Sequence, residues 1–382
     1  MSTLKVTNIE SPSGGGVNAK ITDINGGPLS NRNLIINGAM QVSQRGTSFT
    51  HTTASQFTVD RFVAANGSSF NWNSAVITQS SDTPDGFPNS LKVDVASTST
   101  PTGSHNACFK YLIEAQDLQQ LGFGSSGAKS FTLSFWVKSN KTGAYSVQVL
   151  ASDADKYLLS EYTISSSNTW EQKTLTFVGN TADVIDNNNG AGFELRFNLA
   201  CGSSDITAPK STWTAASGGT IHASTNQVNL FDDASNEWYM TGVQLEVGEI
   251  ATAFEHRSFG DELTRCQRYF QTSFSSSPGT GNTDNTGIVL AGGSTTGNST
   301  TFLGPGHIQL APNMRAAPTV TIYDLDTPRN TGKVHRHTYG SSGSNNNTAV
   351  VTDINTKSFI VRSDSGISAS GIIFHYEVES EL

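Results

Sequence analysis

Three tryptophans that stand among polar residues are the first candidates for binding chemistry. Trp136 lies on the polar side of an alternating stretch, Trp72 stands between two asparagines, and Trp213 stands in a Ser/Thr-rich stretch. An aromatic ring can stack on the apolar face of a sugar, while amide and carboxylate groups bind the sugar hydroxyls. Each tryptophan is therefore a candidate glycan-binding platform. The alternative for each is a cap over the core or a place in a subunit interface.

The second candidate is the short motif His335-Arg336-His337. Residues i and i+2 of a strand point to the same side, so the two imidazoles would lie together. Around a threefold axis, three such pairs would present six imidazoles, enough for an octahedral transition metal. A transition-metal site at His335 and His337 is therefore one interpretation, and an exposed strand without metal is the other.

Catalytic signatures are sparse in this chain. It contains neither G-x-S-x-G nor H-E-x-x-H, the motifs of many hydrolases and metalloproteases. Asp232-Asp233 could serve as acid and base in glycan cleavage. Adjacent strand residues point to opposite faces, however, so the pair is better interpreted as a turn before a strand, with cation binding by one aspartate as an alternative. Asp82 and Asp85 also lie in a turn-like stretch. We expect a protein that is not an enzyme, with a polysaccharide depolymerase as the alternative.

The composition indicates a β-rich protein. Only 14% of the 382 residues are charged, against roughly a quarter in an average soluble protein. Gly, Ser, Thr and Asn are abundant instead, and these residues favour turns and strands over helix interiors. We therefore expect an all-β fold of many short strands joined by polar turns.

Charge, cysteine content and hydropathy argue against several kinds of partner and site. The net charge is −9 and no Lys/Arg run occurs, so nucleic acid is not expected as a partner, whereas a neutral, hydroxyl-rich glycan is compatible. Cys108, Cys201 and Cys266 are far apart and odd in number, which suggests neither a disulfide framework nor a zinc site. The N-terminus lacks an apolar segment, and no apolar run is long enough to cross a membrane. We expect synthesis in a cytoplasm and no membrane insertion.

The first two thirds of the chain divide into three parts. Residues 1–30 have too few apolar side chains for a core, so they are either a disordered leader or an extended arm that orders on a partner. Residues 31–257 contain period-2 stretches such as 131–137, which are typical of a jelly-roll-like β-sandwich. Ser258, with an acid three residues later, predicts a helix N-terminus, so residues 258–270 are a short connecting helix.

The last third predicts a linker and a smaller β domain. Residues 271–286 are rich in Ser, Gly, Thr and Asn and predict the linker. Residues 287–382 contain short strand-like stretches, such as 319–323 and 372–378, and predict the C-terminal β domain. Its Asn-rich stretch at 340–347 is interpreted as an exposed loop, the kind of segment that often carries binding. The candidate contact residues near this loop are Tyr323, Tyr339, Arg336 and His337.

Several stretches resemble tail-fibre and appendage proteins of tailed phages, especially those of cyanobacterial and marine phages. They are NLIINGAMQVSQRG at 33–46, GVQLEVG at 242–248 followed by ATAFEHR at 251–257, and RCQRYF at 265–270. The leader STLKVTNI at 2–9 looks like the virion-anchoring start of such proteins. The middle domain is also similar to carbohydrate-binding jelly rolls.

The resemblance implies a homotrimeric tail fibre or appendage of a virion that attaches to a host-surface glycan. Its arm, residues 1–30, would dock to tail, neck or baseplate proteins, and its C-terminal domain would lie farthest from the particle and contact the host. The protein would be made in the host cytoplasm and reside in the virion. A purely structural neck, collar or capsid-decoration protein is the main alternative.

The resemblance also bears on metals. Some trimeric phage fibre tips use a His-x-His element to hold a metal, which matches His335 and His337. Carbohydrate-binding jelly rolls usually place an acidic calcium ligand shortly after the turn that matches Asn37-Gly38. Met40 and Gln41 stand there in this chain, so a structural calcium is in doubt and no cofactor is expected.

Overall fold

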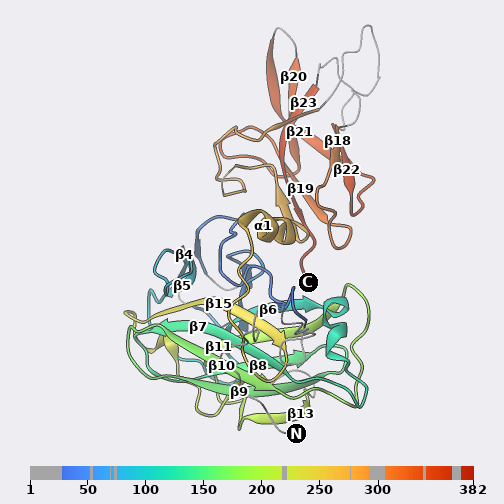
Figure 1. Ribbon diagram of the computed structural model, residues 1–382. Coiled ribbons are helices and arrows are strands. Elements are labelled where there is room, and N and C mark those ends of the chain that lie inside the picture. The colour runs from blue at the N-terminus through green and yellow to red at the C-terminus, as the bar shows by residue number, and fades with distance from the viewer. Residues whose placement is uncertain are drawn as a thin grey trace, which may run out of the picture.

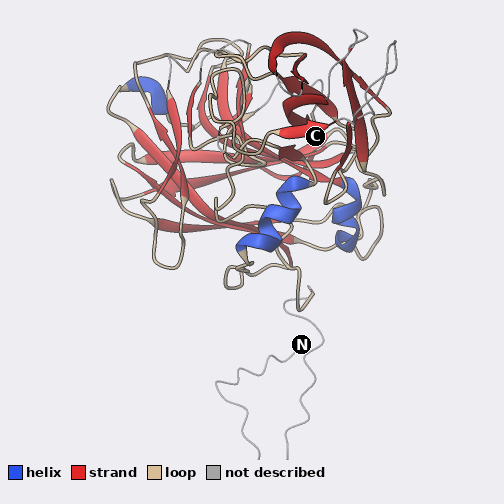
Figure 2. Ribbon diagram, turned by 90° about the horizontal axis from the view of Figure 1, so that it is seen from above, coloured by secondary structure: helices blue, strands red, loops and turns tan. Residues whose placement is uncertain are grey.

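The computed structural model describes residues 28–382 apart from 52–54, 69, 73–74, 217–221, 276, 292–305, 339–340 and 364–370, and apart from the side chains of 337–338 and 341–345. Strands dominate this part of the chain and its helices are short, as Figure 2 shows. The all-β prediction is therefore confirmed. The predicted arm lies outside the described residues as far as residue 27. Among the residues described, no helix has the length and hydropathy to span a membrane.

The strands between Ser48 and Val247 form a sandwich of two antiparallel sheets, which confirms the predicted β-sandwich (Figure 1). The six described strands of the first sheet run in the order β1 (Ser48–Thr50), β4 (Val76–Ser80), β5 (Ser90–Asp94), β15 (Glu237–Val247), β7 (Phe131–Ser139) and β10 (Glu171–Phe177). The seven of the second run in the order β13 (Lys210–Ala215), β9 (Lys156–Ile164), β8 (Gly143–Ala151), β11 (Ala191–Cys201), β6 (Asn106–Glu114), β3 (Val63–Gly67) and β2 (Gln56–Phe57). Smaller elements are the parallel pair β12 (Ile206–Thr207) and β14 (Ala223–Ser224) and the 3-10 helices η2 (Ala115–Leu121) and η3 (Leu230–Asp232).

The sandwich core follows from the alternation in the sequence. The inward residues of β7, from Phe131 to Val137, are fully buried, and Phe135 packs edge-on against Phe197 of β11 with ring centroids 5.4 Å apart. Burying an aromatic or aliphatic side chain of this size stabilises the fold by about 1.5–3 kcal/mol. One face of each sheet therefore packs in the core, and the other face points away from it.

The predicted connecting helix is present and shorter than expected. Helix α1 spans Phe259–Gln267 and lies between the sandwich and the C-terminal domain (Figure 1). Ser258 caps it, since its Oγ accepts a hydrogen bond from the Asp261 N–H at 3.2 Å and donates one to the Asp261 carboxylate at 2.7 Å. The chain then enters a strand at Phe270, inside the range predicted as helix.

The C-terminal domain is built on the long strand β23 (Gly371–Glu379). Strand β23 pairs along its length with β16 (Phe270–Thr272), β17 (Val289–Ala291), β19 (Thr319–Tyr323) and β20 (Lys333–Thr338). The sheet continues through β21 (Ser341–Thr352) and β22 (Ser358–Ser363) to β18 (Gly306–Gln309). The predicted loop at 340–347 is wrong from residue 341 onward, because the polar residues there form the start of β21. Asn and Ser are poor strand formers, and pairing with β20 overrides that preference.

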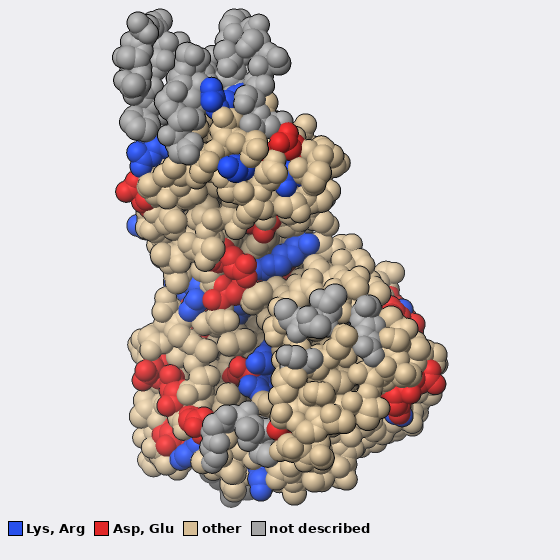
Figure 3. Space-filling view, turned by 180° about the vertical axis from the view of Figure 1, so that it is seen from behind, with Lys and Arg blue, Asp and Glu red and all other residues tan. Residues whose placement is uncertain are grey.

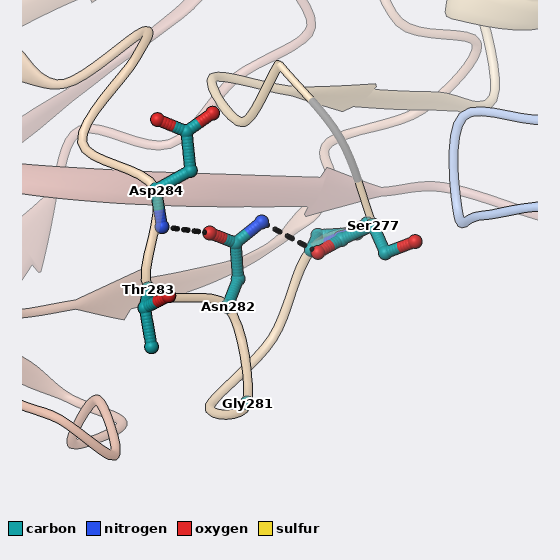
Figure 4. A pocket seen from close by; sticks show the side chains of 6 residues that line it. Ser277, Gly281, Asn282, Thr283 and Asp284 are labelled. Atoms are coloured by element: carbon teal, nitrogen blue, oxygen red, sulfur yellow. Dashed lines mark hydrogen bonds between the residues drawn. The ribbon is translucent and has the colours of Figure 1, made fainter.

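The linker predicted at 271–286 is also wrong, because this segment is part of the C-terminal domain. Residues 271 and 272 pair with β23, and Phe274 is buried in a stack against His375 with ring centroids 4.1 Å apart. Figure 4 shows how the following residues are held around a shallow hollow. The Asn282 side chain donates to the Ser277 carbonyl at 2.9 Å and accepts from the Asp284 N–H at 2.7 Å. Hydrogen bonds between side chains and the backbone thus order a segment whose Ser, Gly, Thr and Asn content predicted a linker.

Charged side chains join the two domains. Figure 3 shows acidic and basic residues side by side at the waist between them. Glu114 of the sandwich is fully buried and accepts hydrogen bonds from Tyr269 Oη at 2.6 Å and Arg268 Nη2 at 2.8 Å. Arg61 lies with its guanidinium 3.5 Å from the centroid of the Tyr269 ring and forms an ion pair with Glu381. The C-terminal domain is therefore docked on the sandwich through buried polar contacts.

Candidate functional site

Cross-strand register brings four side chains into one row on the outer face of the six-stranded sheet. Lys138 of β7 lies opposite Tyr239 of β15, and Tyr239 lies opposite Lys92 of β5. Trp170 directly precedes β10, whose first residue pairs with Val137, so Trp170 lies beside Lys138. Residues directly opposite one another on neighbouring strands are close enough for their side chains to interact. The row therefore forms one continuous surface across β10, β7, β15 and β5.

Asp82, in the connection between β4 and β5, fixes two members of this row. One carboxylate oxygen accepts from Trp170 Nε1 at 3.1 Å, and the other accepts from the Lys138 ammonium. Partial burial opposes ionisation of Asp82, but these two hydrogen bonds outweigh it and hold the pKa of this carboxyl below its usual value. The Lys138 ammonium also lies 4.2 Å from the centroid of the Tyr239 ring, within reach of a cation–π interaction.

Two facing carboxylates complete the row. Asp94 and Glu237 are cross-strand partners, and Lys92 Nζ lies 2.6 Å from the first and 2.9 Å from the second. Burial raises the pKa of Asp94, whereas Lys92 and Tyr239 donate hydrogen bonds to Glu237 and lower its pKa despite partial burial. The two carboxylates therefore share the single ammonium group of Lys92.

We call the seven residues of this cluster the Trp170 site. Its members are Asp82, Lys92, Asp94, Lys138, Trp170, Glu237 and Tyr239. The Trp170 ring is half-buried, and its centroid lies 6.0 Å from that of Tyr239, which is 5% exposed. The site therefore combines one fixed indole ring with carboxylate acceptors and ammonium donors.

Trp136, a predicted platform, lies next to this site in a more crowded place. Its ring packs over Gly242, where a register shift interrupts the pairing of β15 with β7 and where φ is +62°. A Cβ at this position would lie 2.7 Å from Phe87 Cζ and 3.0 Å from Trp136 Cδ1, so only glycine lets both rings approach the backbone. Phe87 in turn packs edge-on against Phe254. Trp136 is half-buried and helps to cover the sheet.

Of the two interpretations of Trp72, the exposed platform is wrong and the place at the core describes it better. Its side chain is fully buried, stacks on His51 with ring centroids 4.5 Å apart, and meets Phe109 and Phe231 edge-on. The flanking asparagines suggested exposure, but the ring turns inward and fills the end of the sandwich core. Trp72 therefore belongs to the core.

Trp213 caps the edge of the core. Its indole packs edge-on against Phe123, lies against Phe193, and donates from Nε1 to the Val178 carbonyl at 3.0 Å. The ring is half-buried, so the alternative role as a core cap describes Trp213 better than that of a platform.

The C-terminal candidates do not form a described contact surface. Tyr323 is buried, which contradicts its prediction as a contact residue, because its ring packs edge-on against Phe274 on the face of β19 opposite to the core residue Ile322. Arg336 is half-buried and donates to the Asn347 side chain at 3.0 Å. Tyr339 lies outside the described residues, as does the side chain of His337.

The proposed metal sites concern the His335-Arg336-His337 motif and the Asn37-Gly38 turn. His335 and His337 lie on β20, opposite Ile373 and Gly371, which confirms that the motif is in a strand. Among the residues described, no group of three or more His, Cys, Asp or Glu side chains could hold a metal ion. At the Asn37-Gly38 turn, the Asn37 amide donates to the Val42 and Asp60 carbonyls at 2.8 and 2.9 Å. The carbonyl oxygens of Val42 and Asp60 are thus already hydrogen-bonded to the Asn37 side chain.

The aspartates singled out in the sequence have separate roles. Asp232 ends η3 and pairs with Lys141, while Asp233 accepts from the Ser235 N–H at 2.8 Å, so this pair is the predicted turn before β15. Asp82, in contrast, was interpreted only as a turn residue and proves to hold the Trp170 ring. Sequence reasoning missed Trp170, Tyr239 and Lys92 because their proximity depends on strand order. The one available signal is the position of Lys138, two residues after Trp136, which places both side chains on the same face of the strand.

Comparisons with known proteins give likenesses to part of the chain. No protein-family model and no curated protein matches. Among solved structures, the enzymatically active domain of bacteriophage CBA120 tailspike protein 4 is 16% identical over 56% of this chain and 21% of its own, with a TM-score of 0.28. The xylan-binding CBM22-2 domain of Paenibacillus barcinonensis Xyn10C is 13% identical over 49% and 91%, with a TM-score of 0.26. TmCBM61, in complex with β-1,4-galactotriose, is 6% identical over 57% and 99%, with a TM-score of 0.28. These TM-scores are low, so the functional argument rests on this chain's own side chains.

Proposed function

We propose that this protein is a non-enzymatic structural protein of a phage particle, a homotrimeric fibre or appendage that binds a host-surface glycan. The observation that carries glycan binding is the Trp170 site, where Asp82 fixes an indole ring at one end of a row that has two further carboxylates at its other end. The stretches at 33–46, 242–257 and 265–270, which resemble phage appendage proteins, support the virion assignment. The leader at 2–9 supports docking to other virion proteins through residues 1–30.

The chemistry of the Trp170 site suits a sugar. The hydrogen bond from Trp170 Nε1 to Asp82 fixes the ring before a ligand arrives, so little conformational entropy is lost on binding. An indole face offers stacking area to the C–H side of a pyranose ring. Asp94 and Glu237 nearby are hydrogen-bond acceptors that match sugar hydroxyls.

A trimer fits the sheet edges and the chemistry of attachment. Strands β1 and β10 are the outer strands of the six-stranded sheet among the described residues, and exposed edges are commonly hidden in subunit contacts. Three identical sites on one rigid particle raise the overall avidity, so each site needs only weak affinity. The buried junction between the domains makes each subunit rigid enough to present its site in a fixed direction.

One observation favours a polysaccharide depolymerase as a second candidate. Asp94 and Glu237 are carboxylates on facing strands next to an aromatic ring, the arrangement that glycan cleavage uses. Lys92 Nζ, however, lies between the two carboxylates, 2.6 Å from Asp94 and 2.9 Å from Glu237. That leaves no room between them for a glycosidic bond and a water molecule. We therefore propose binding without cleavage, and release of oligosaccharide that Glu237→Gln abolishes would overturn this part.

The deciding experiment measures glycan binding by the full-length protein and two variants. On a microarray of microbial surface oligosaccharides, the unaltered protein should bind a defined subset, and Trp170→Ala should lower the affinity for that subset about tenfold or more. Trp213→Phe is the matched control, because Trp213 caps the core away from the site and phenylalanine retains its packing. Absence of binding, or equal binding by Trp170→Ala, would favour a purely structural neck, collar or decoration protein.

A further inference from the structure

The Trp170 site is asymmetric in how it exposes its charges. The exposed fractions of its acidic side chains are 46% for Asp82, 38% for Glu237 and 35% for Asp94. Those of its basic side chains are 20% for Lys92 and 11% for Lys138. A ligand that approaches from solvent therefore meets carboxylates first and ammonium groups only beneath them.

The two ammonium groups are also committed to partners within the site. Lys138 Nζ pairs with Asp82 and lies over the Tyr239 ring, while Lys92 Nζ bridges Asp94 and Glu237. To bind an acidic sugar, a lysine would have to leave these partners, and the carboxylates left behind would then be unpaired. Three acids against two lysines leave a net negative charge at the site, in a chain whose net charge is −9.

We infer that the Trp170 site, if it binds glycans as proposed above, selects neutral sugars rich in hydroxyl groups and rejects those that carry carboxylate or sulfate. A carboxylate rim accepts hydrogen bonds and donates none, so the ligand must supply the donors. Sugar hydroxyls do so without a charge. A uronic acid or a sulfate would place a negative charge against the rim, and like charges across an interface suppress binding.

The salt dependence of binding follows from the same arrangement. Attraction between opposite exposed charges weakens as salt is added, whereas stacking and hydrogen bonding to a neutral sugar change little. Binding of the selected glycan should therefore be nearly constant between low and physiological ionic strength. An acidic glycan held by the lysines would instead be released as salt increases.

The test uses acidic microbial polysaccharides before and after chemical reduction of their carboxyl groups, which converts uronic acids to neutral hexoses without changing the linkages. The full-length protein is titrated with both forms at low and physiological salt, beside Trp170→Ala and the control Trp213→Phe. We expect at least fivefold tighter binding to the reduced form of a recognised polysaccharide, with Trp170→Ala removing it. We also expect Glu237→Gln to decrease the ratio of the affinity for the reduced form to the affinity for the acidic form.

The outcomes separate this inference from the proposed function. Equal or tighter binding of the acidic form that still depends on Trp170 would overturn the selectivity for neutral sugars and leave glycan binding at the Trp170 site standing. Binding of neither form, or binding that Trp170→Ala does not change, would overturn both. A preference for the reduced form that vanishes in Trp170→Ala supports both.

Discussion

The orientation of the Trp170 ring depends on one carboxylate that is itself half-exposed. Asp82 receives hydrogen bonds from Trp170 Nε1 and from Lys138, so one side chain fixes both the ring and the neighbouring cation. Exposed ion pairs contribute little to stability. The value of this contact therefore lies in preorganising the ring and not in holding the fold together.

Replacing Asp82 should accordingly separate binding from stability. In Asp82→Ala, the Trp170 ring loses its partner and gains rotational freedom, so we expect glycan affinity to fall about tenfold. The free energy of unfolding should change by no more than about 1 kcal/mol, because Asp82 is half-exposed and the Lys138 ammonium keeps its contact with the Tyr239 ring. Asp85→Ala is the matched control, since Asp85 lies in the same turn and outside the Trp170 site. Calorimetric titration together with thermal unfolding measures both quantities, and equal affinity of the two variants would contradict the expectation.

Two histidines predict how stability depends on pH. Burial and the neighbouring Arg329 lower the pKa of His375 to about 4, and burial with Arg196 lowers that of His222 to about 3. Both imidazoles stay neutral in the folded protein while they take up protons near pH 6.5 in the unfolded chain. The stability that they contribute is therefore complete above pH 6.5 and is lost as the pH falls toward 4.

We expect the midpoint of thermal unfolding to fall steadily between pH 7 and pH 4.5. In His375→Gln, the curve should start lower, because the stack on Phe274 is lost, and should decline less steeply. His307→Gln is the control, since His307 is exposed on β18. A variant of His375 with an unchanged slope would show that another group governs the acid sensitivity.

The residue scale is also where sequence reasoning was least successful. Asparagines on both sides of Trp72 made it a candidate platform beside its alternative as a core cap, and the ring lies in the core, whereas Trp170 was not singled out and lies at the candidate site. Local composition reports which residues precede and follow a tryptophan. Whether the ring faces solvent depends on the strands that lie beside it, and that order follows from long-range pairing.

At the scale of elements, the sequence predicted what is local and missed what is distant. The period-2 alternation of β7 and the cap at Ser258 follow from neighbours in the chain, and both were predicted. The linker at 271–286 was wrong because its order depends on distant partners, chiefly β23 and Arg329. Arg329 donates to the Asp284 carbonyl at 2.6 Å from 45 residues away. Such contacts leave no periodic pattern in the sequence.

The junction between the domains yields a stability prediction. Glu114 is fully buried between Arg268, Arg315 and Tyr269, and removing one partner from a buried polar network leaves the others uncompensated. We therefore expect Glu114→Ala to lower the free energy of unfolding by about 3–5 kcal/mol. Denaturant unfolding followed by fluorescence measures this loss.

Glu249→Ala is the matched control for Glu114→Ala, because Glu249 lies on the surface of the sandwich. The control should change the free energy of unfolding by less than about 0.5 kcal/mol. The unaltered protein should unfold in a single transition, because the domains share this buried network. Two well-separated transitions in the unaltered protein would show that the junction does not couple them.

At the scale of the whole molecule, the rigid junction changes where host contact is expected. The sequence placed recognition in residues 287–382, on a flexible linker and an exposed loop at 340–347. The structure replaces the linker with ordered contacts and the loop with β21, and it buries Tyr323. These three supports for recognition in the C-terminal domain are thus removed, and we propose the Trp170 site on the sandwich as the point of contact.

Assembly is the first prediction at this scale. Light scattering on the purified full-length protein should give about three times the chain mass of 40.6 kDa. The reason is the proposed trimer, in which sheet edges and the C-terminal domains form the contacts between subunits. The measurement is repeated across a tenfold range of micromolar concentrations. A monomer throughout this range would rule out the trimer in solution.

Avidity links the trimer to adsorption and gives the last prediction. If three Trp170 sites act together on one surface, the apparent affinity for immobilised glycan should exceed the affinity for a soluble monovalent oligosaccharide by about a hundredfold or more. The full-length protein should therefore compete with phage for adsorption to host cells at concentrations well below the single-site Kd. Trp170→Ala should lose this competition far more strongly than it loses monovalent binding, because the defect is repeated at every site of the trimer.

The comparison that decides between the domains uses Arg336→Ala in the same adsorption assay. Arg336 is half-buried on β20 and bonds to Asn347, so this variant alters the C-terminal domain without touching the sandwich. We expect Arg336→Ala trimers to compete as well as the unaltered protein and Trp170→Ala trimers to fail. The reverse order would return recognition to residues 287–382. Full competition by both variants would remove both candidates, because trimers that still adsorb must then use a surface that neither residue represents.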